Sequence, residues 1–301
     1  MNLLEAFILG MIQGITEFLP ISSSGHLVLG QDFLGLQLEL FKSFDVVVHL
    51  GSLFAILVYF RREVFGMLSA FWKFVTFRLD KTNPYWKLII YIFVATVPVA
   101  FIGFFGEDWI DSQFRSSAGV ATAMIVTGLV FISGEFAYKH VHNFAPVVDK
   151  FKFSASVRFE KIMDIFKPGG YEPKELRGVR LSTAVFVGIF QVAALIPGVS
   201  RSGATIVAGL FRGVERSVAA KFSFLLAMPA IFGAGLLTII KDGGEFFSTS
   251  ASVPLESLAL GFSASFVFSF LSIGFLMHFF KKFSLNIFAV YLIVLGLWTF
   301  F

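Results

Sequence analysis

Residues 10–25, GMIQGITEFLPISSSG, and residues 188–203, GIFQVAALIPGVSRSG, are two copies of one pattern that lie 178 positions apart. Each copy is an apolar stretch that proline interrupts before it opens into a Ser/Gly turn. The repetition predicts a fold with two similar halves. The paired positions are Gly10 and Gly188, Gln13 and Gln191, Ser22 and Ser200, Ser24 and Ser202, and Gly25 and Gly203.

The composition is that of a membrane protein. Hydrophobic residues make up 56% of the chain, charged residues only 15%, and the mean hydropathy is +0.82. Several apolar runs reach the roughly 20 residues that a helix needs to cross a bilayer. The chain has no cysteine, which excludes disulfides and thiolate chemistry. The start, MNLLEAFILG, lacks the basic residues of a cleavable signal, so we expect it to be mature sequence.

Two kinds of apolar segment can be distinguished. The stretches 3–31 and 182–212 contain the repeated motifs and are broken near the middle. Each half is too short to cross, and a break exposed to lipid would leave backbone groups unpaired, so each stretch is predicted to be a re-entrant helical hairpin. The uninterrupted segments predict six transmembrane spans, at 43–60, 88–105, 118–138, 219–240, 257–280 and 284–301.

The basic residues fall in alternate loops. If basic loops are cytoplasmic, both termini lie outside and the two hairpins enter the membrane from opposite sides. The net charge of +4 comes mostly from these basic loops and does not indicate nucleic-acid binding. We therefore expect membrane lipid as a partner and no nucleic acid. The basic stretches, which hold 20 of the 24 Lys and Arg residues, are 61–87, 139–180, 212–221 and 281–282.

The predicted fold is therefore an all-α polytopic membrane protein arranged as an inverted-topology repeat. The first repeat covers residues 1–138 and the second covers 181–301. A basic cytoplasmic connector, 139–180, joins them. In such repeats the broken helices meet near the middle of the membrane, so we expect the two Ser/Gly turns to form one site.

The first turn offers a carboxylate, an amide, hydroxyls and an imidazole. Gln13 and Glu17 are four residues apart and share a helix face, where their oxygens could hold a divalent cation, Mg²⁺ or Ca²⁺. Ser23 and His26 follow. Ser23 could attack phosphorus with His26 accepting and returning a proton, or His26 or Glu17 could activate water directly. Residue types alone leave both routes open.

The second turn adds Arg201, whose guanidinium can grip two phosphate oxygens at once. Together the turns predict a site for a phosphate ester or anhydride, with Glu17, Ser23, His26 and Arg201 as its catalytic residues. The residues expected to contact phosphate are Ser22, Ser24, Gly25, Ser200, Arg201, Ser202, Gly203 and Thr205.

Two motifs, TEFLPISSSGH at 16–26 and PGVSRSGAT at 197–205, resemble the signatures of the bacterial undecaprenyl-pyrophosphate phosphatases of the bacitracin-resistance type. The resemblance extends over nearly the whole chain. It implies a multi-pass enzyme of the bacterial cytoplasmic (inner) membrane that hydrolyses undecaprenyl diphosphate to the monophosphate lipid carrier, with a divalent cation and an active site open to the outer, periplasmic side. It also implies a role in cell-wall synthesis and bacitracin resistance.

The chain departs from the common family pattern at three positions. Gln13 stands where many members have Glu, which weakens the metal assignment; Ser24 replaces a frequent Thr, and His49 a frequent Gln. A different class of function, a lipid transporter or flippase, also fits inverted repeats with broken helices. The sequence leaves open whether the protein forms a homodimer.

Other polar residues lie within or near the predicted spans. Asp45 and His49 share one helix face and either support the site or pair with each other. Glu135, Lys221 and His278 lie near span ends, where we expect their side chains to extend to the membrane surface.

Overall fold

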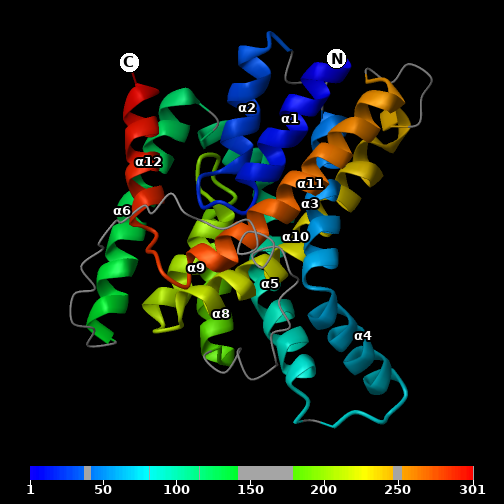
Figure 1. Ribbon diagram of the computed structural model, residues 1–301, viewed down its shortest axis with the longest axis vertical. Helices are drawn as coiled ribbons and strands as arrows, with labels where there is room; N and C mark the ends of the chain where they lie inside the picture. The colour runs from blue at the N-terminus through cyan, green and yellow to red at the C-terminus, as the bar shows by residue number, and fades with distance from the viewer. Residues whose placement is uncertain (37–41, 81, 115, 142–178, 247–252, 301) are drawn as a thin grey trace, which may run out of the picture.

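The computed structural model describes every residue except 37–41, 81, 115, 142–178, 247–252 and 301. Most of the predicted connector, 139–180, therefore lies outside the described residues. Across the described part, the chain forms helices and no strand, as the all-α prediction requires (Figure 1). The helices are α1 (Leu3–Thr16), α2 (Ser23–Phe33), α3 (Lys42–Tyr59), α4 (Arg61–Val75), α5 (Pro84–Phe114), α6 (Ser117–Val141), α8 (Leu181–Ala193), α9 (Arg201–Phe211), α10 (Arg216–Phe246), α11 (Leu255–Phe279) and α12 (Asn286–Trp298).

Four of the described helices, α5, α6, α10 and α11, are long and apolar enough to cross a membrane. They coincide with four of the six predicted spans and confirm a multi-pass membrane protein. A fifth crossing is counted only if α3 and α4 together form one broken span, and these two helices meet at an angle of 83°. Helix α12 has 13 residues, so it is only about 20 Å long, against about 30 Å of hydrocarbon. The count of six spans stays a prediction.

Helix α4 corrects the prediction of a plain basic loop at 61–87. It begins at Arg61, directly after the bend, and runs for 15 residues. Its basic residues are combined with exposed apolar side chains, including Phe65, Phe71 and Trp72. A helix with this composition is typical of the membrane surface, where the apolar face enters the headgroup region.

Both predicted hairpins are broken where the sequence indicated. Helix α1 ends at Thr16, three residues before Leu19-Pro20, and α2 begins at Ser23. Helix α8 ends at Ala193, and α9 begins at Arg201 after Pro197-Gly198. The Ser200 hydroxyl caps α9 by accepting a hydrogen bond from the Gly203 N–H at 3.1 Å. A local serine cap thus restarts α9, whereas α2 begins without a side-chain cap.

Each hairpin packs its first helix against a long helix of the other half. Helix α1 lies along α11, and α8 lies along α5 (Figure 1). Glycines make this close approach possible: a Cβ on Gly14 would stand 2.6 Å from the Ser265 carbonyl oxygen, and one on Gly188 would stand 2.8 Å from the Ala95 carbonyl oxygen. Small residues at such contacts let two helix backbones meet directly in a membrane.

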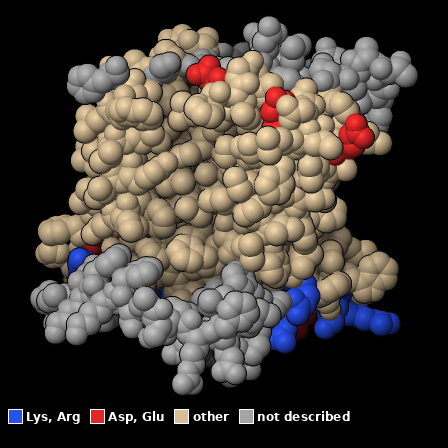
Figure 2. Space-filling model, turned by 45° about the horizontal axis from the view of Figure 1, so that its top comes forward, with Lys and Arg blue, Asp and Glu red and all other residues tan. Residues whose placement is uncertain are grey.

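Charged residues gather at opposite ends of the molecule. Figure 2 shows only acidic residues at one end and the basic residues, with a few acidic ones among them, at the other; an uncharged band lies between. Helix α1 begins and α12 ends at the same end of the molecule (Figure 1). The band corresponds to the part of the surface that contacts lipid tails.

Two of the residues expected to extend to the membrane surface are instead buried in ion pairs. Glu135 is 1% exposed, and its carboxylate accepts hydrogen bonds from Arg216 Nε at 2.9 Å and from the Leu285 N–H at 2.8 Å. Lys221 is 3% exposed, with its Nζ 2.6 Å from Glu63 Oε1. Arg216 and Glu63, on other helices, compensate the charges of Glu135 and Lys221. The two side chains can therefore stay buried and need not extend to the surface. His278 is exposed, in line with the prediction.

Candidate active site

The two helix breaks meet, as the inverted arrangement predicts. The Arg201 guanidinium, at the start of α9, forms an ion pair with Glu17 at the end of α1. The side chain of Glu17 is 4% exposed and that of Arg201 is 18% exposed. Ser202 strengthens the junction by donating a hydrogen bond to the Leu19 carbonyl at 3.2 Å. The predicted catalytic carboxylate and guanidinium therefore share one buried site.

Glu17 is the centre of a hydrogen-bonded cluster. Its Oε2 accepts from Gln13 Nε2 at 2.9 Å and from the Ser23 hydroxyl at 2.7 Å. Its Oε1 faces Arg201. The helical spacing between Gln13 and Glu17 places them together, and the break after Glu17 turns the chain so that Ser23 returns to the same carboxylate. Glu17 is thus held as an acceptor by three donors.

His26 lies at the first turn of α2, with both ring nitrogens engaged. Its Nδ1 lies 2.8 Å from the Ser22 carbonyl oxygen, which can only accept, so Nδ1 carries the proton. The other nitrogen, Nε2, lies 2.7 Å from the hydroxyl of Tyr291. In the neutral ring, Nε2 is therefore the basic nitrogen, and Tyr291 donates to it.

Tyr291 was missed by the sequence interpretation. Besides the hydrogen bond, its ring stacks on His26 with 5.8 Å between centroids and 16° between planes. It lies on α12, 265 positions from His26, so no local motif connects the two. The one available signal was a phenol in the otherwise apolar run NIFAVYLIVLGLW.

His49 contacts both Asp45 and the site, so the structure contains elements of both alternatives for this pair. Its Nδ1 donates to the Asp45 backbone carbonyl at 2.6 Å, which leaves Nε2 3.7 Å from Glu17 Oε2. The Asp45 carboxylate accepts from Gln31 Nε2 at 2.8 Å. His49 thus brings a nitrogen-bearing ring close to the Glu17 carboxylate.

The hydroxyls of the second turn are already hydrogen-bonded within the protein. Ser200 and Ser202 share a hydrogen bond of 3.1 Å. The Thr205 hydroxyl is bonded to the Arg201 carbonyl at 2.9 Å and to the Ser223 hydroxyl at 2.6 Å. These residues hold the turn that presents Arg201. The glycine beside them, Gly203, is pressed against the Phe131 ring.

Several buried polar atoms at the site have no protein partner. Among the described residues, six buried side-chain atoms lack one, and three of these are Gln13 Oε1, Ser22 Oγ and Arg201 Nη1. Ser22 also has φ +70° and makes no side-chain cap for α2. Buried polar groups are nearly always satisfied, so this concentration of free atoms indicates a ligand. The other expected phosphate contacts, Ser24 and Gly25, lie on the same turn, where Ser24 is exposed.

Comparison with known proteins matches residues 6–298 to the family described as Bacitracin resistance protein BacA. The chain belongs to this family. A BacA relative named undecaprenyl-diphosphatase, from Rubrobacter xylanophilus, is 38% identical and covers 97% of this chain and 94% of its own. Another relative, from Shouchella clausii and named undecaprenyl-diphosphatase 1, is 36% identical. Its match covers 100% of this chain and 96% of the relative.

The match to the BacA family confirms the resemblance drawn from two motifs. Both turns, with Glu17 and Arg201, lie inside the matched range. The relatives are also aligned over nearly their whole length, so the similarity is not limited to the two motifs. A relative from Corynebacterium efficiens, 38% identical, covers 99% of this chain and 89% of its own.

Proposed function

We propose that this protein hydrolyses undecaprenyl diphosphate to undecaprenyl phosphate and inorganic phosphate, which recycles the lipid carrier of cell-wall synthesis and resists bacitracin. The observation that supports it most directly is the Glu17–Arg201 pair, with an unpartnered guanidinium nitrogen facing no protein acceptor. The relatives' name, undecaprenyl-diphosphatase, indicates the substrate.

The diphosphate would bind between the two turns. Arg201 Nη1 and the Ser22 hydroxyl are buried donors without partners, and phosphate oxygens are their natural acceptors. The first N–H groups of α2 add to the site, because helix starts favour anions and Ser22 does not cap this one. Ser200, Ser202 and Thr205 would act indirectly, by holding Arg201 in place.

In the route through Ser23, its oxygen attacks the terminal phosphorus while undecaprenyl phosphate leaves. The Ser23 hydroxyl donates to Glu17 at 2.7 Å, so Glu17 is placed to receive its proton. Water then cleaves the phosphoserine: the water gives its proton to His26 Nε2, which requires the Tyr291 hydroxyl to leave that nitrogen, and Glu17 returns its proton to the departing Ser23 oxygen. In the direct route, Glu17 or His26 activates water against the diphosphate itself. Single-turnover hydrolysis followed by mass measurement of the hairpin peptide distinguishes them, since only the first route leaves phosphate on Ser23.

A divalent cation, Mg²⁺ or Ca²⁺, would be held by Gln13 and Glu17. Gln13 Oε1 is a buried carbonyl oxygen without a partner beside the Glu17 carboxylate, which fits a hard cation. Such a cation neutralises charge on the phosphate oxygens when bound. Within the described part of the chain, no group of three or more His, Cys, Asp or Glu side chains could hold a metal. The remaining ligands would therefore be substrate phosphate and water.

The proposed arrangement is an inverted repeat with the active site open to the outer side. The reciprocal packing of α1 on α11 and of α8 on α5 supports two related halves. The segregation of basic and acidic residues supports placing the basic end in the cytoplasm (Figure 2). Both termini would then lie outside.

Phosphate release from undecaprenyl diphosphate by detergent-purified protein, with Mg²⁺ or Ca²⁺ present, tests the proposal. We expect turnover in the wild type and its loss in His26→Ala at unchanged thermal unfolding temperature. Arg201→Ala should also lose turnover and still fold, but unfold at a lower temperature, because the buried Glu17 carboxylate loses its partner. Protein that releases no phosphate but moves polyprenyl phosphate across liposomes would support a transporter instead.

A further inference from the structure

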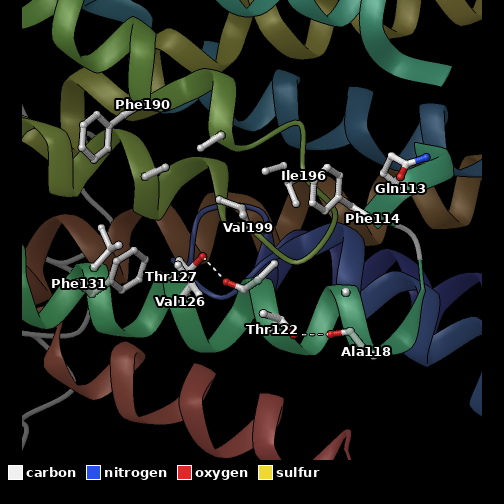
Figure 3. Close-up of a pocket in the computed structure, with 15 residues that line it drawn as sticks. Gln113, Phe114, Ala118, Thr122, Val126, Thr127, Phe131, Phe190, Ile196 and Val199 are labelled. Atoms are coloured by element: carbon white, nitrogen blue, oxygen red, sulfur yellow. Dashed lines mark hydrogen bonds between the residues drawn. The ribbon is translucent and has the colours of Figure 1, made fainter. Parts of the chain in front are cut away.

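An apolar cavity of about 600 Å³ lies beside the second turn (Figure 3). One face of α6 forms its long wall, and the end of α5 closes the rim through Gln113 and Phe114. Helix α8 and the turn that follows it supply the opposite wall, through Phe190, Ile196 and Val199. The cavity therefore runs along α6 between the hairpin and the lipid.

The lining of this cavity suits hydrocarbon. Its hydroxyls belong to Thr122 and Thr127, which donate to the Ala118 and Ala123 carbonyls of their own helix, each at 2.7 Å. Figure 3 shows these side chains with their hydroxyl oxygens turned toward α6. Their hydrogen bonds are therefore satisfied, so the cavity wall presents mainly methyl, methylene and aromatic groups. A pocket of this kind binds apolar ligands and gives a charged headgroup no partner.

The cavity and the phosphate site share one turn of the chain. Val199 and Ala204 line the cavity and flank Arg201, whose guanidinium lies at Glu17. Phe131, which also lines the cavity, contacts Gly203 in the first turn of α9. An amphiphile with its anionic group on Arg201 would thus have an apolar cavity beside its first carbons.

We propose that this cavity binds the first isoprene units of the substrate's polyprenyl chain. This proposal rests on the proposed phosphatase function, which supplies the amphiphile. At roughly 30 Å³ for a water-sized group, the cavity holds on the order of 20 carbons, or about four isoprene units. The rest of an undecaprenyl chain lies in the bilayer. The competing occupant is the acyl chain of an ordinary membrane lipid.

The test compares prenyl diphosphates of increasing length on purified protein: dimethylallyl, geranyl, farnesyl and geranylgeranyl. We expect kcat/KM to rise through geranylgeranyl and then to level off toward undecaprenyl. Two substitutions, Val126→Phe and Ala193→Phe, would fill the cavity from opposite walls. Each should lower kcat/KM on geranylgeranyl diphosphate roughly tenfold or more and lower it much less on dimethylallyl diphosphate, whose single isoprene unit needs only about a quarter of the space.

The control is Val267→Phe on α11, a valine that is 48% exposed, against 51% for Val126, and lies outside the cavity. Val267→Phe should not change how kcat/KM depends on the length of the prenyl chain. Equal losses on short and long substrates in the filled variants, or no loss on either, would overturn the proposal and leave the cavity to bilayer lipid. Absence of phosphate release from every diphosphate by the wild type would instead refute the phosphatase function itself.

Discussion

The Arg201 guanidinium forms an ion pair with Glu17, 184 positions earlier in the chain, inside a multi-pass membrane protein. Each residue ends or begins a half-helix of its own hairpin. A buried charge without a partner is very costly, so this pair ties the two hairpins together. It also places the guanidinium proposed to bind phosphate beside the carboxylate proposed to act in catalysis.

Arg201→Lys should be nearly as damaging as Arg201→Ala. The planar guanidinium reaches Glu17 with one nitrogen and leaves the other for phosphate, a geometry that an ammonium cannot supply. We expect kcat/KM for phosphate release to fall by roughly 10²- to 10³-fold. The exposed Arg212 gives the matched control, since Arg212→Lys removes the same group far from Glu17. Near-normal activity in Arg201→Lys would argue against a role in which one guanidinium nitrogen holds Glu17 while another binds phosphate.

Tyr291→Phe should lower kcat roughly tenfold with little change in KM. The substitution keeps the ring that stacks on His26 but removes the hydroxyl that holds Nε2. Steady-state kinetics on farnesyl diphosphate check this. Val290→Ala is the control, because Val290 is the adjacent exposed residue of α12. If both variants lost activity equally, Tyr291 would only support the packing of α12.

Gln13→Glu should lower the concentration of Mg²⁺ or Ca²⁺ needed for half-maximal activity, several-fold. It replaces an amide oxygen by a carboxylate beside Glu17, and a second negative charge strengthens cation binding. Gln191→Glu is the matched control, because the repeat partner of Gln13 bonds to the Ala95 carbonyl and lies outside the Glu17 cluster. Cation titration of phosphate release measures both. An unchanged cation requirement in Gln13→Glu would place the ion elsewhere.

Glu135→Ala should destabilise the fold by about 3–5 kcal/mol, because it leaves the Arg216 guanidinium without its carboxylate. The same carboxylate accepts from the Leu285 N–H, so it joins the start of α12 to α6 and α10. Unfolding in detergent, followed by tryptophan fluorescence, measures the loss. Glu215→Ala, at an exposed neighbour, should have little effect. Recovery of stability in Glu135→Leu/Arg216→Met would show that the cost lies in the unpaired charge.

Gly14→Ala should reduce both stability and activity. The new methyl group would lie 2.6 Å from the Ser265 carbonyl oxygen and 2.9 Å from the Ser269 nitrogen, so α1 must move away from α11. We expect a loss of about 1–3 kcal/mol, and a fall in kcat because Glu17 moves with α1. The control is Gly233→Ala on α10, where a Cβ meets nothing within 4 Å. Equal behaviour of the two variants would contradict tight packing at Gly14.

The sequence predicts the helix breaks and the Gln13–Glu17 contact because both depend on residues within one or two helical turns. Proline, glycine and serine end or cap helices within one turn, so the breaks near Pro20 and Pro197 could be located. The pairing of Gln13 with Glu17 follows from helical periodicity. Charge bias along the chain also indicated that the two turns would converge.

Other features depended on neighbours distant in sequence. The bend between α3 and α4 and the burial of Lys221 against Glu63 were missed. Tyr291 could not be assigned to His26 without the packing of α12 on α6. The Ser22 hydroxyl has no hydrogen-bond partner in the protein, whereas the Thr205 hydroxyl is bonded to Ser223. The two hydroxyls are chemically alike, so only their surroundings in the fold make this difference.

The amino-acid sequence by itself determined that the protein lies in lipid, where its helices break, and which residue types could bind a diphosphate. These properties depend on composition and on contacts within a turn or two. The tertiary structure alone decided which polar atoms remain free, which nitrogen of His26 is basic, and where hydrocarbon can enter. Those outcomes depend on helices that meet only after the whole chain has packed, since a hydrogen bond between residues 265 positions apart leaves no local pattern.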